Sequence, residues 1–240
     1  MSELIAMILP VQALSPSDRR EMFSVYARYY EATSWELFQS DLEEKQYALV
    51  LRDRADVIQG FTTIAITETS HNGAPLRAIF SGDTIIDRNH WGTQQLAFNW
   101  IRFAGKVKAE KPDVPLYWFL IVKGHRTYRF LPTFSIDFYP HWERPIPAQV
   151  KRLMDRLAED RFGDTYDPET GVIEFPTSRG HLNPDLVAVS ASEARRADVA
   201  FFLDRNPGYS RGNELVCLTE LALDNLRPIA QRQFLEGLAE

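Results

Sequence analysis

The sequence contains a single cysteine, Cys217, which excludes an internal disulfide framework and a thiolate metal cluster. It also lacks any apolar stretch long enough to cross a bilayer. The apolar start, Met1 to Pro10, is short and has neither a basic opening nor a small-residue cleavage site, so it does not resemble a signal peptide. We therefore expect no membrane span and a cytoplasmic location.

A strong charge of one sign is also missing. The formal net charge is -6, and basic residues are scattered among acidic ones, so no broad positive face for nucleic acid is expected. The five histidines show neither the i, i+4 spacing nor the clustering with carboxylates that a metal site needs. The sequence therefore predicts neither a metal nor a nucleic-acid partner.

The composition that remains is that of an ordinary globular protein, with 45% hydrophobic and 25% charged residues. A chain of 240 residues can bury a sizeable core, and it carries no internal repeat or low-complexity tract. We expect one continuous domain over residues 1–240. The proline-rich stretch from Pro140 to Pro147 is flanked by aromatic residues, which favours a packed connection over a domain boundary.

The first half predicts an antiparallel meander preceded by helices. Ser15 and Pro16 suit a helix start, and Thr33 with Glu36 has the spacing of a capping box. Asn72-Gly73 is the dipeptide typical of a type I′ hairpin turn. The predicted strands are Ile5 to Leu14, Tyr47 to Leu51, Val57 to Glu68 and Leu76 to Asp87.

The second half adds a parallel strand. Apolar residues between Leu96 and Val107 recur every three or four positions, as in an amphipathic helix, and Leu116 to Val122 is an apolar run typical of a strand covered on both faces. Strand, helix and strand in succession predict a parallel pair within a mixed α/β sheet. Further expected elements are a turn at Thr127 to Leu131, a helix at Ala148 to Ala158, strands at Asp198 to Leu203 and Glu214 to Leu218, and a last helix.

The segment from Phe80 to Gln94 joins a predicted strand to a predicted helix. Gly82 indicates a bulge or a close backbone approach, and Gly92 with Thr93 lies where free helix amides favour a phosphate. The structural alternative stays open, because glycine is common in strand-to-helix turns without any ligand.

This order of elements, and above all the stretches Leu76 to Val107 and Leu116 to Tyr128, resembles the GNAT acyltransferase superfamily. The resemblance covers roughly residues 5–220. Within it, the segments Phe80 to Trp91 and Asn206 to Val216 are similar to those of a broad group of bacterial GNAT-like proteins. It implies a mostly antiparallel sheet flanked by helices, with the fourth and fifth strands parallel and splayed. An extension over about residues 140–240 is expected to complete the sheet and add helices.

The resemblance also implies a donor site, in which a pantetheine arm binds the backbone near Thr84 to Asp87 and a pyrophosphate binds main-chain amides. The family loop has Gln or Arg, two residues, Gly, one residue, then Gly or Ala. This chain has Asn89, Gly92 and Gln94 at those positions, so only the central glycine matches. The expected donor is acetyl-CoA or another acyl-CoA, with phosphopantetheine on an acyl carrier protein as the alternative. The implied donor-binding residues are Thr84, Ile85, Ile86, Arg88, His90, Trp91, Gly92, Thr93 and Gln94.

Four residues are candidates for catalysis. Acyl transfer to an amine needs a base for the ammonium proton and an acid for the leaving thiolate. By resemblance, Asp83 takes the position of the base and Tyr128 that of the acid, although each is also compatible with a purely structural role. Lys123 and His125 follow the apolar strand, where ligands gather in open α/β sheets, or they belong to a solvated loop.

The leading hypothesis is therefore an N-acyltransferase that moves an acyl group from a thioester to a small-molecule amine or another amine acceptor. The main alternative is a catalytically inactive GNAT-like module that binds a ligand or a partner protein. A different reaction on a carrier-bound thioester also remains open, because fold does not fix function.

Overall fold

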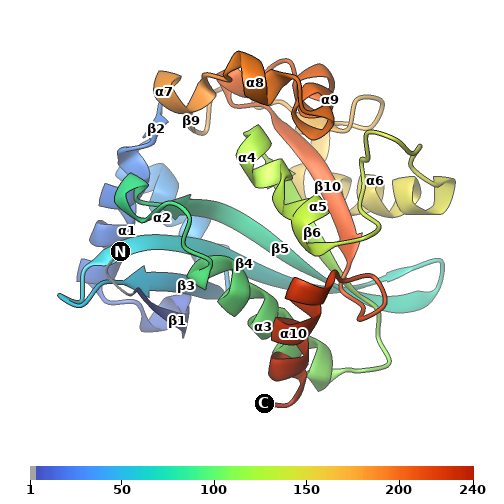
Figure 1. The fold of residues 1–240 in the computed structure, drawn as a ribbon, viewed down its shortest axis with the longest axis horizontal. Helices are drawn as coiled ribbons and strands as arrows, with labels where there is room; N and C mark the ends of the chain where they lie inside the picture. The colour runs from blue at the N-terminus through green and yellow to red at the C-terminus, as the bar shows by residue number, and fades with distance from the viewer. Residues whose placement is uncertain (1–3) are drawn as a thin grey trace. The chain divides into compact units, whose positions relative to one another are not determined.

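The structure is a computed structural model that describes residues 4–240 (Figure 1). Its internal contacts divide the chain into two compact units. The first unit comprises residues 4–28, 34–118 and 221–240, and the second comprises residues 29–33 and 119–220. The single continuous domain expected from the sequence stays a prediction.

The first unit is built on an antiparallel meander. Its strands are β1 (Ile5–Pro10), β3 (Tyr47–Arg52), β4 (Ile58–His71) and β5 (Ala74–Ile86), hydrogen-bonded in that order, and the first residues of β6 (Leu116–Val122) follow β5. The β4–β5 hairpin turns at Asn72 and Gly73, whose φ angles of 52° and 81° are those that a type I′ turn requires. Strand β6 runs parallel to β5, which confirms the predicted mixed sheet.

Helices cover both faces of this meander. Phe61 and Tyr47 point to opposite faces, because Phe61 is paired with Val50 and successive side chains of a strand alternate. Phe61 packs on Phe38 at a ring distance of 6.0 Å, and Tyr47 packs on Phe103 at 5.2 Å. The helices on the Phe61 side are α1 (Pro16–Ala27) and α2 (Trp35–Glu43), and those on the Tyr47 side are α3 (Gln95–Glu110) and α10 (Pro228–Leu238) (Figure 1).

Local sequence signals explain where two of these elements begin and where a third ends. Ser15 and Asp18 form a capping box at the start of α1, as the sequence suggests. Helix α2 is capped by Ser34, whose side chain accepts the amide of Leu37, so the predicted cap at Thr33 is wrong by one residue. Strand β1 is shorter than predicted, because a 3-10 turn at Val11–Ala13 follows Pro10.

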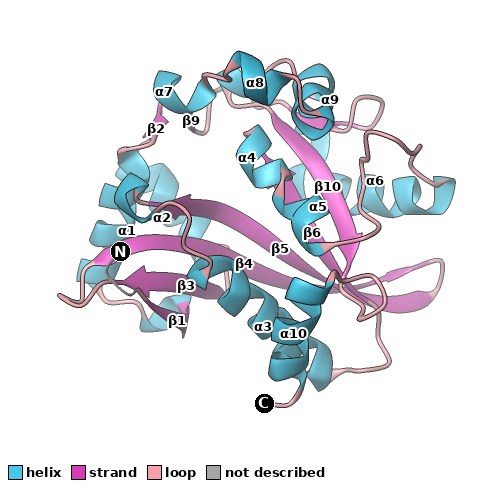
Figure 2. Ribbon diagram, in the orientation of Figure 1, coloured by secondary structure: helices cyan, strands magenta, loops and turns pink. Residues whose placement is uncertain are grey.

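The second unit contains further strands of the sheet together with several helices (Figure 2). Its strands follow the order β6, β10 (Glu214–Glu220), β8 (Val172–Ile173) and β7 (Tyr166–Asp167), and a separate pair joins β2 (Tyr30–Glu31) to β9 (His181–Leu182). Its helices are α4 (His125–Tyr128), α5 (Phe130–Phe134), α6 (Ala148–Phe162), α7 (Pro184–Val187), α8 (Ala191–Ala194) and α9 (Ala197–Arg205).

One predicted strand of this unit is wrong. Residues Asp198 to Leu203 form part of helix α9, not a strand. A short apolar run fits either element, and here Val199 and Phe202, three residues apart, are both fully buried on one side of the helix. The segment from Pro140 to Pro147 lies wholly within this unit, and Tyr139 just before it exchanges two backbone hydrogen bonds with Leu218 of β10.

Candidate functional site

Gly82 lies in a β-bulge of β5, as the sequence suggests. The register between β4 and β5 shifts so that Thr63 alone faces both Gly82 and Asp83. A Cβ atom on Gly82 would lie 2.4 Å from Thr63 Oγ1, so only glycine fits this approach. Asp83 is half-buried at this irregular point of the strand. The bulge therefore sets the direction of the Asp83 side chain.

The residues after the bulge lead to the candidate donor loop. Thr84, Ile85 and Ile86 pair with Thr62, Phe61 and Gly60 of β4, and the Thr84 hydroxyl lies 2.7 Å from that of Thr62. One edge of this part of β5 is therefore fixed by β4. The half-buried Ile86 carbonyl accepts the Trp91 indole N–H at 2.9 Å, which ties the loop back to the strand.

Asp87 anchors the turn that follows. Its side chain is buried and accepts the Arg28 guanidinium at 2.6 Å and the Asn89 amide at 3.0 Å. Its backbone N–H donates to Gln59, and its carbonyl accepts the amide of His90. These four bonds hold the 3-10 turn Arg88–His90 in one conformation. The importance of Asp87 and Arg28 is not visible in the sequence, because their partnership depends on the fold.

The loop then presents backbone amides at the start of helix α3. The amides of Asn89, His90, Trp91 and Thr93 are bonded within the loop. Among the hydrogen bonds of residues 4–240, no protein acceptor is found for the amides of Gly92, Gln94, Leu96 and Ala97. Gly92 has a φ angle of 90°, which favours glycine. Amides without a protein acceptor at the positive end of a helix, here one of 16 residues, are a feature that favours an anion.

Side chains add positive charge beside these amides. The Arg88 guanidinium lies 5.5 Å from the centre of the Trp91 ring, and both residues are exposed. His90 is half-buried, while Gln94 is exposed and makes no side-chain cap to the helix. The Gln94 side chain is therefore directed into solvent.

In the second unit, Lys123 and His125 are both largely buried and both paired. Lys123 Nζ lies 3.4 Å from Glu214 Oε1 and 5.5 Å from the centre of the Tyr30 ring. His125 Nε2 lies 3.5 Å from Glu193 Oε1. Burial, together with Arg126, lowers the pKa of His125 and keeps the imidazole neutral near pH 7. The solvated-loop alternative therefore does not describe these two side chains.

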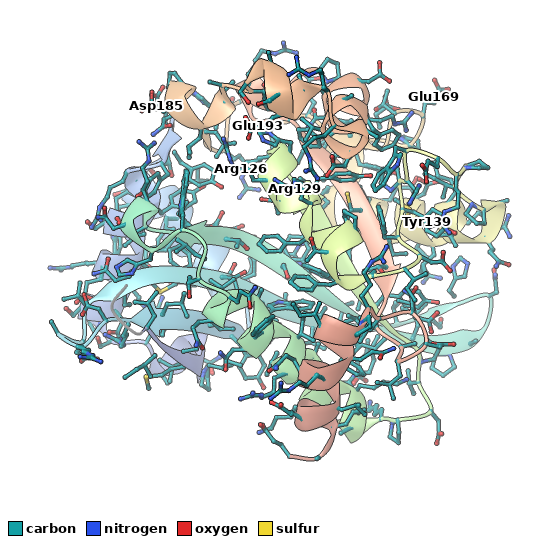
Figure 3. All side chains as sticks on the ribbon, in the orientation of Figure 1. Arg126, Arg129, Tyr139, Glu169, Asp185 and Glu193 are labelled. Carbon is teal, nitrogen blue, oxygen red and sulfur yellow. The ribbon has the colours of Figure 1, made fainter. Side chains whose placement is uncertain are left out.

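Glu193 is a partner that the sequence did not reveal. Its carboxylate accepts both the amide and the hydroxyl of Ser190 at the start of α8, and these bonds, with His125 and Arg126, lower its pKa to about 2. Figure 3 shows Glu193 and Arg126 facing each other from α8 and α4. The signal that was available is the Ser190-to-Glu193 capping-box spacing, which predicts a helix start but no partner.

Tyr128 is fully buried among aromatic rings. Its hydroxyl donates to the Pro140 carbonyl at 2.8 Å, and Phe138, Phe201 and Phe202 surround its ring. Burial raises the pKa of Tyr128, so the hydroxyl stays protonated. Protonation is what a general acid needs, yet the contacts are equally those of a core tyrosine.

The structure thus gathers the predicted residues in two places. Asp83 and the loop from Thr84 to Gln94 belong to the first unit, whereas Lys123, His125 and Tyr128 belong to the second. Within residues 4–240, no three His, Cys, Asp or Glu side chains are grouped as metal ligands. No helix in this described range is both long and apolar enough to span a bilayer. Cys217 is buried, and burial raises its thiol pKa.

No protein-family model and no curated protein matches this sequence. The solved structures that resemble the chain include GNAT acetyltransferases. A probable N-acyltransferase of unknown function from Enterococcus faecalis V583 is 13% identical over 56% of this chain and 33% of its own length, with a TM-score of 0.40. The Escherichia coli GNAT family N-acetyltransferase YhbS, in complex with CoA, is 15% identical over 55% of this chain and 69% of its own, with a TM-score of 0.39.

Arabidopsis thaliana NAA60, in complex with a bisubstrate analogue, is 15% identical over 56% of this chain and 86% of its own, with a TM-score of 0.40. The matched part of this chain thus spans about a third of the first of these proteins, 33% of its length. Likeness at this level assigns no role to any residue of this chain.

Proposed function

We propose that this chain is an N-acyltransferase that takes an acyl group from an acyl-CoA thioester and transfers it to an amine. The observation that carries the proposal is the set of backbone amides at Gly92, Gln94, Leu96 and Ala97, which no protein acceptor uses among the described residues. The diphosphate of CoA is an anion that such donors bind.

The residues around these amides fit a diphosphate. The Asp87 carboxylate accepts hydrogen bonds from the Arg28 guanidinium and the Asn89 amide, and the Arg28 charge neutralises it. Arg88 supplies an exposed cation next to Trp91. The positive end of the α3 macrodipole adds roughly half an elementary charge. The exposed Gln94 side chain carries no charge and leaves its own amide accessible.

In this proposal, Asp83 accepts the ammonium proton of the acceptor amine, and the leaving thiolate takes a proton from solvent. The Gly82 bulge places Asp83 at an irregular point of β5. Tyr128 is fully buried in the second unit, and its raised pKa makes it a weaker acid than an ordinary tyrosine, so its role as the acid stays a prediction. Asp83→Asn is expected to lower kcat with little change in CoA affinity.

Calorimetry on a charge-introducing variant tests the donor site. Gln94→Glu places a carboxylate at the helix start, where it favours the helix but repels a diphosphate. We expect wild-type protein to bind CoA, and the variant to bind it at least about 10-fold more weakly while binding pantetheine equally well. The matched control is Gln149→Glu, another exposed glutamine in the first turn of a long helix, α6.

Other outcomes of this experiment contradict the proposal or redirect it. Absence of CoA binding by the wild-type protein contradicts the acyl-CoA donor, and binding of a phosphopantetheinylated carrier protein in its place would assign the carrier as donor. CoA binding without transfer to any of a panel of amines would favour the catalytically inactive binding module.

A further inference from the structure

Three polar side chains of the second unit lie in a row, and none of them has a role in the proposed function. Ser178 Oγ lies 3.4 Å from His181 Nδ1, and His181 Nε2 lies 3.5 Å from Glu31 Oε2. Glu31 and His181 are directly paired across β2 and β9, and directly paired residues on antiparallel strands point to the same side. The fold therefore sets a carboxylate, an imidazole and a hydroxyl in the order that activates a serine.

The hydrogen bonds around Ser178 favour transfer of its hydroxyl proton to the His181 imidazole. Ser178 Oγ accepts the Gly180 amide at 3.3 Å, so its own hydrogen is left for His181. A proton on Nε2 directed toward Glu31 leaves Nδ1 as the acceptor. The Ser178–His181 distance is at the long end of the hydrogen-bond range, and the His181–Glu31 distance is that of an ion pair without a hydrogen bond; such contacts often tighten only when a substrate binds.

A ligand can also reach these three side chains, because each is partly exposed to solvent. The side chain of His181 is 27% exposed and that of Glu31 is 55% exposed, and Ser178 is half-buried. Gly212 lies next to Ser178 and His181 and puts no side chain between them and a ligand. A Cβ at this position would lie 3.6 Å from Ser178 Oγ and 3.4 Å from the His181 Cβ. The φ angle of 98° at Gly212 adds a second reason for glycine.

The location of the row connects it with β6. Leu182, next to His181, contacts Gly124 directly after the strand, with its Cδ1 3.0 Å from the place a Cβ would occupy. Tyr30, next to Glu31, lies under the Lys123 ammonium. All of these residues belong to the same unit. The row therefore lies near the carboxyl end of β6, the position at which ligands gather in open α/β sheets.

We propose that Ser178 is a nucleophile that accepts an acyl group from an activated ester or thioester. Its Oγ bonds to the acyl carbon while the carbon–sulfur or carbon–oxygen bond to the leaving group breaks. The Ser178 proton passes to His181 Nδ1 and then to the leaving thiolate or alkoxide. Glu31 is a positioning residue that holds the imidazole and stabilises its charged form.

The acyl-serine then has two fates. An acceptor amine attacks the ester carbon, loses a proton to His181, and releases the Ser178 oxygen, which takes that proton back. Water in place of the amine gives hydrolysis. The amine fate rests on the proposed acyltransferase function, whereas formation of the acyl-serine does not depend on CoA.

The test uses p-nitrophenyl acetate, an activated ester with no CoA portion. We expect the full-length protein to release p-nitrophenol and to gain one acetyl group, mapped by peptide mass spectrometry to Ser178. Ser178→Ala is expected to abolish that adduct, and His181→Gln to slow its formation by about 100-fold. Glu31→Gln is expected to slow it by a smaller factor. The control is Ser192→Ala, an exposed serine in α8 of the same unit.

A wild-type protein that gains no acetyl group on Ser178 overturns the inference, whether or not any variant folds. An unchanged acetylation rate at Ser178 in a folded His181→Gln variant, checked by circular dichroism, overturns the role of His181. CoA binding without Ser178 acetylation would leave the proposed function standing and remove this inference. Ser178 acetylation without CoA binding would do the reverse.

Discussion

At the scale of single residues, burial and pairing decide which of the candidate side chains are chemically available. Lys123 is held by Glu214, and His125 is kept neutral by burial. Tyr128 has its hydroxyl bonded to a carbonyl inside an aromatic cluster. Ser178 and His181 are only partly covered, and both are more accessible than His125 and Tyr128.

Asp18 offers a residue-scale prediction about pH. Burial alone raises the pKa of this carboxyl, but hydrogen bonds from Arg52 and from Ser15 outweigh burial and hold the pKa below its ordinary value of 3.8. A folded-state pKa below the unfolded one gives stability that is present above pH 3.8 and is lost as the pH falls through the lower folded value. Asp18→Ala is therefore expected to cost about 1–2 kcal/mol at pH 7.

Urea unfolding at several pH values checks this. The difference between wild type and Asp18→Ala is expected to shrink steadily as the pH is lowered below 3.8, because there the unfolded chain's carboxyl is mostly protonated while the folded one still resists protonation. An equal difference at every pH would mean that the Asp18 charge contributes nothing.

At the scale of elements, the bulge in β5 depends on a glycine meeting a threonine. Gly82→Ala would place a methyl group 2.4 Å from Thr63 Oγ1 and 3.0 Å from Lys45 Cε. Such overpacking is expected to destabilise the fold by about 1–3 kcal/mol. The double variant with Thr63→Ala removes the clashing hydroxyl, whose oxygen is buried without a hydrogen-bond partner among the described residues.

Thermal or denaturant unfolding of the two single variants and the double variant measures this coupling. We expect Thr63→Ala to recover part of the stability lost in Gly82→Ala, so that the effects are not additive. Strict additivity would show that the close approach of Gly82 to Thr63 does not limit the bulge.

Elements with local signals could be predicted from the sequence, and those without could not. Asn72-Gly73 determines the hairpin because both residues need positive φ, and the stripe from Leu96 to Val107 matches a helix alone. The run Asp198 to Leu203 is short, and every residue after Asp198 is apolar, so its period does not separate helix from strand. Only its packing in the second unit makes it a helix.

At the scale of the whole molecule, the predicted single domain leads to a test of cooperativity. The chain passes between the two units at residues 28/29, 33/34, 118/119 and 220/221, and the third crossing lies inside β6. Partial unfolding of one unit would therefore disturb a strand that the other unit also uses. We expect the slowest-exchanging amides of β4 and of β10 to open with the same free energy in native-state hydrogen exchange. Clearly different values would indicate two independently unfolding domains.

The fold of the whole molecule also explains which residue pairs of the candidate site could not be predicted from the sequence. The turn at Gly92 and the start of α3 carry local sequence signals, so this strand-to-helix connection could be predicted, whereas its role as a donor loop stays a prediction. The pairs Arg28 with Asp87 and Glu31 with His181 join segments far apart in sequence, and no local pattern announces them. Long-range pairing of this kind is a property of the fold and not of any single element.

The central proposal is that the amides of Gly92, Gln94, Leu96 and Ala97 at the start of α3, which have no protein acceptor among the described residues, bind the diphosphate of CoA. Amide chemical shifts of isotope-labelled protein, recorded during titration with CoA and separately with pantetheine, test it directly. We predict that CoA shifts the Gly92, Gln94, Leu96 and Ala97 signals and that pantetheine leaves these four unchanged. CoA-induced shifts elsewhere with none at these four residues, or no shifts at all, would contradict the proposal.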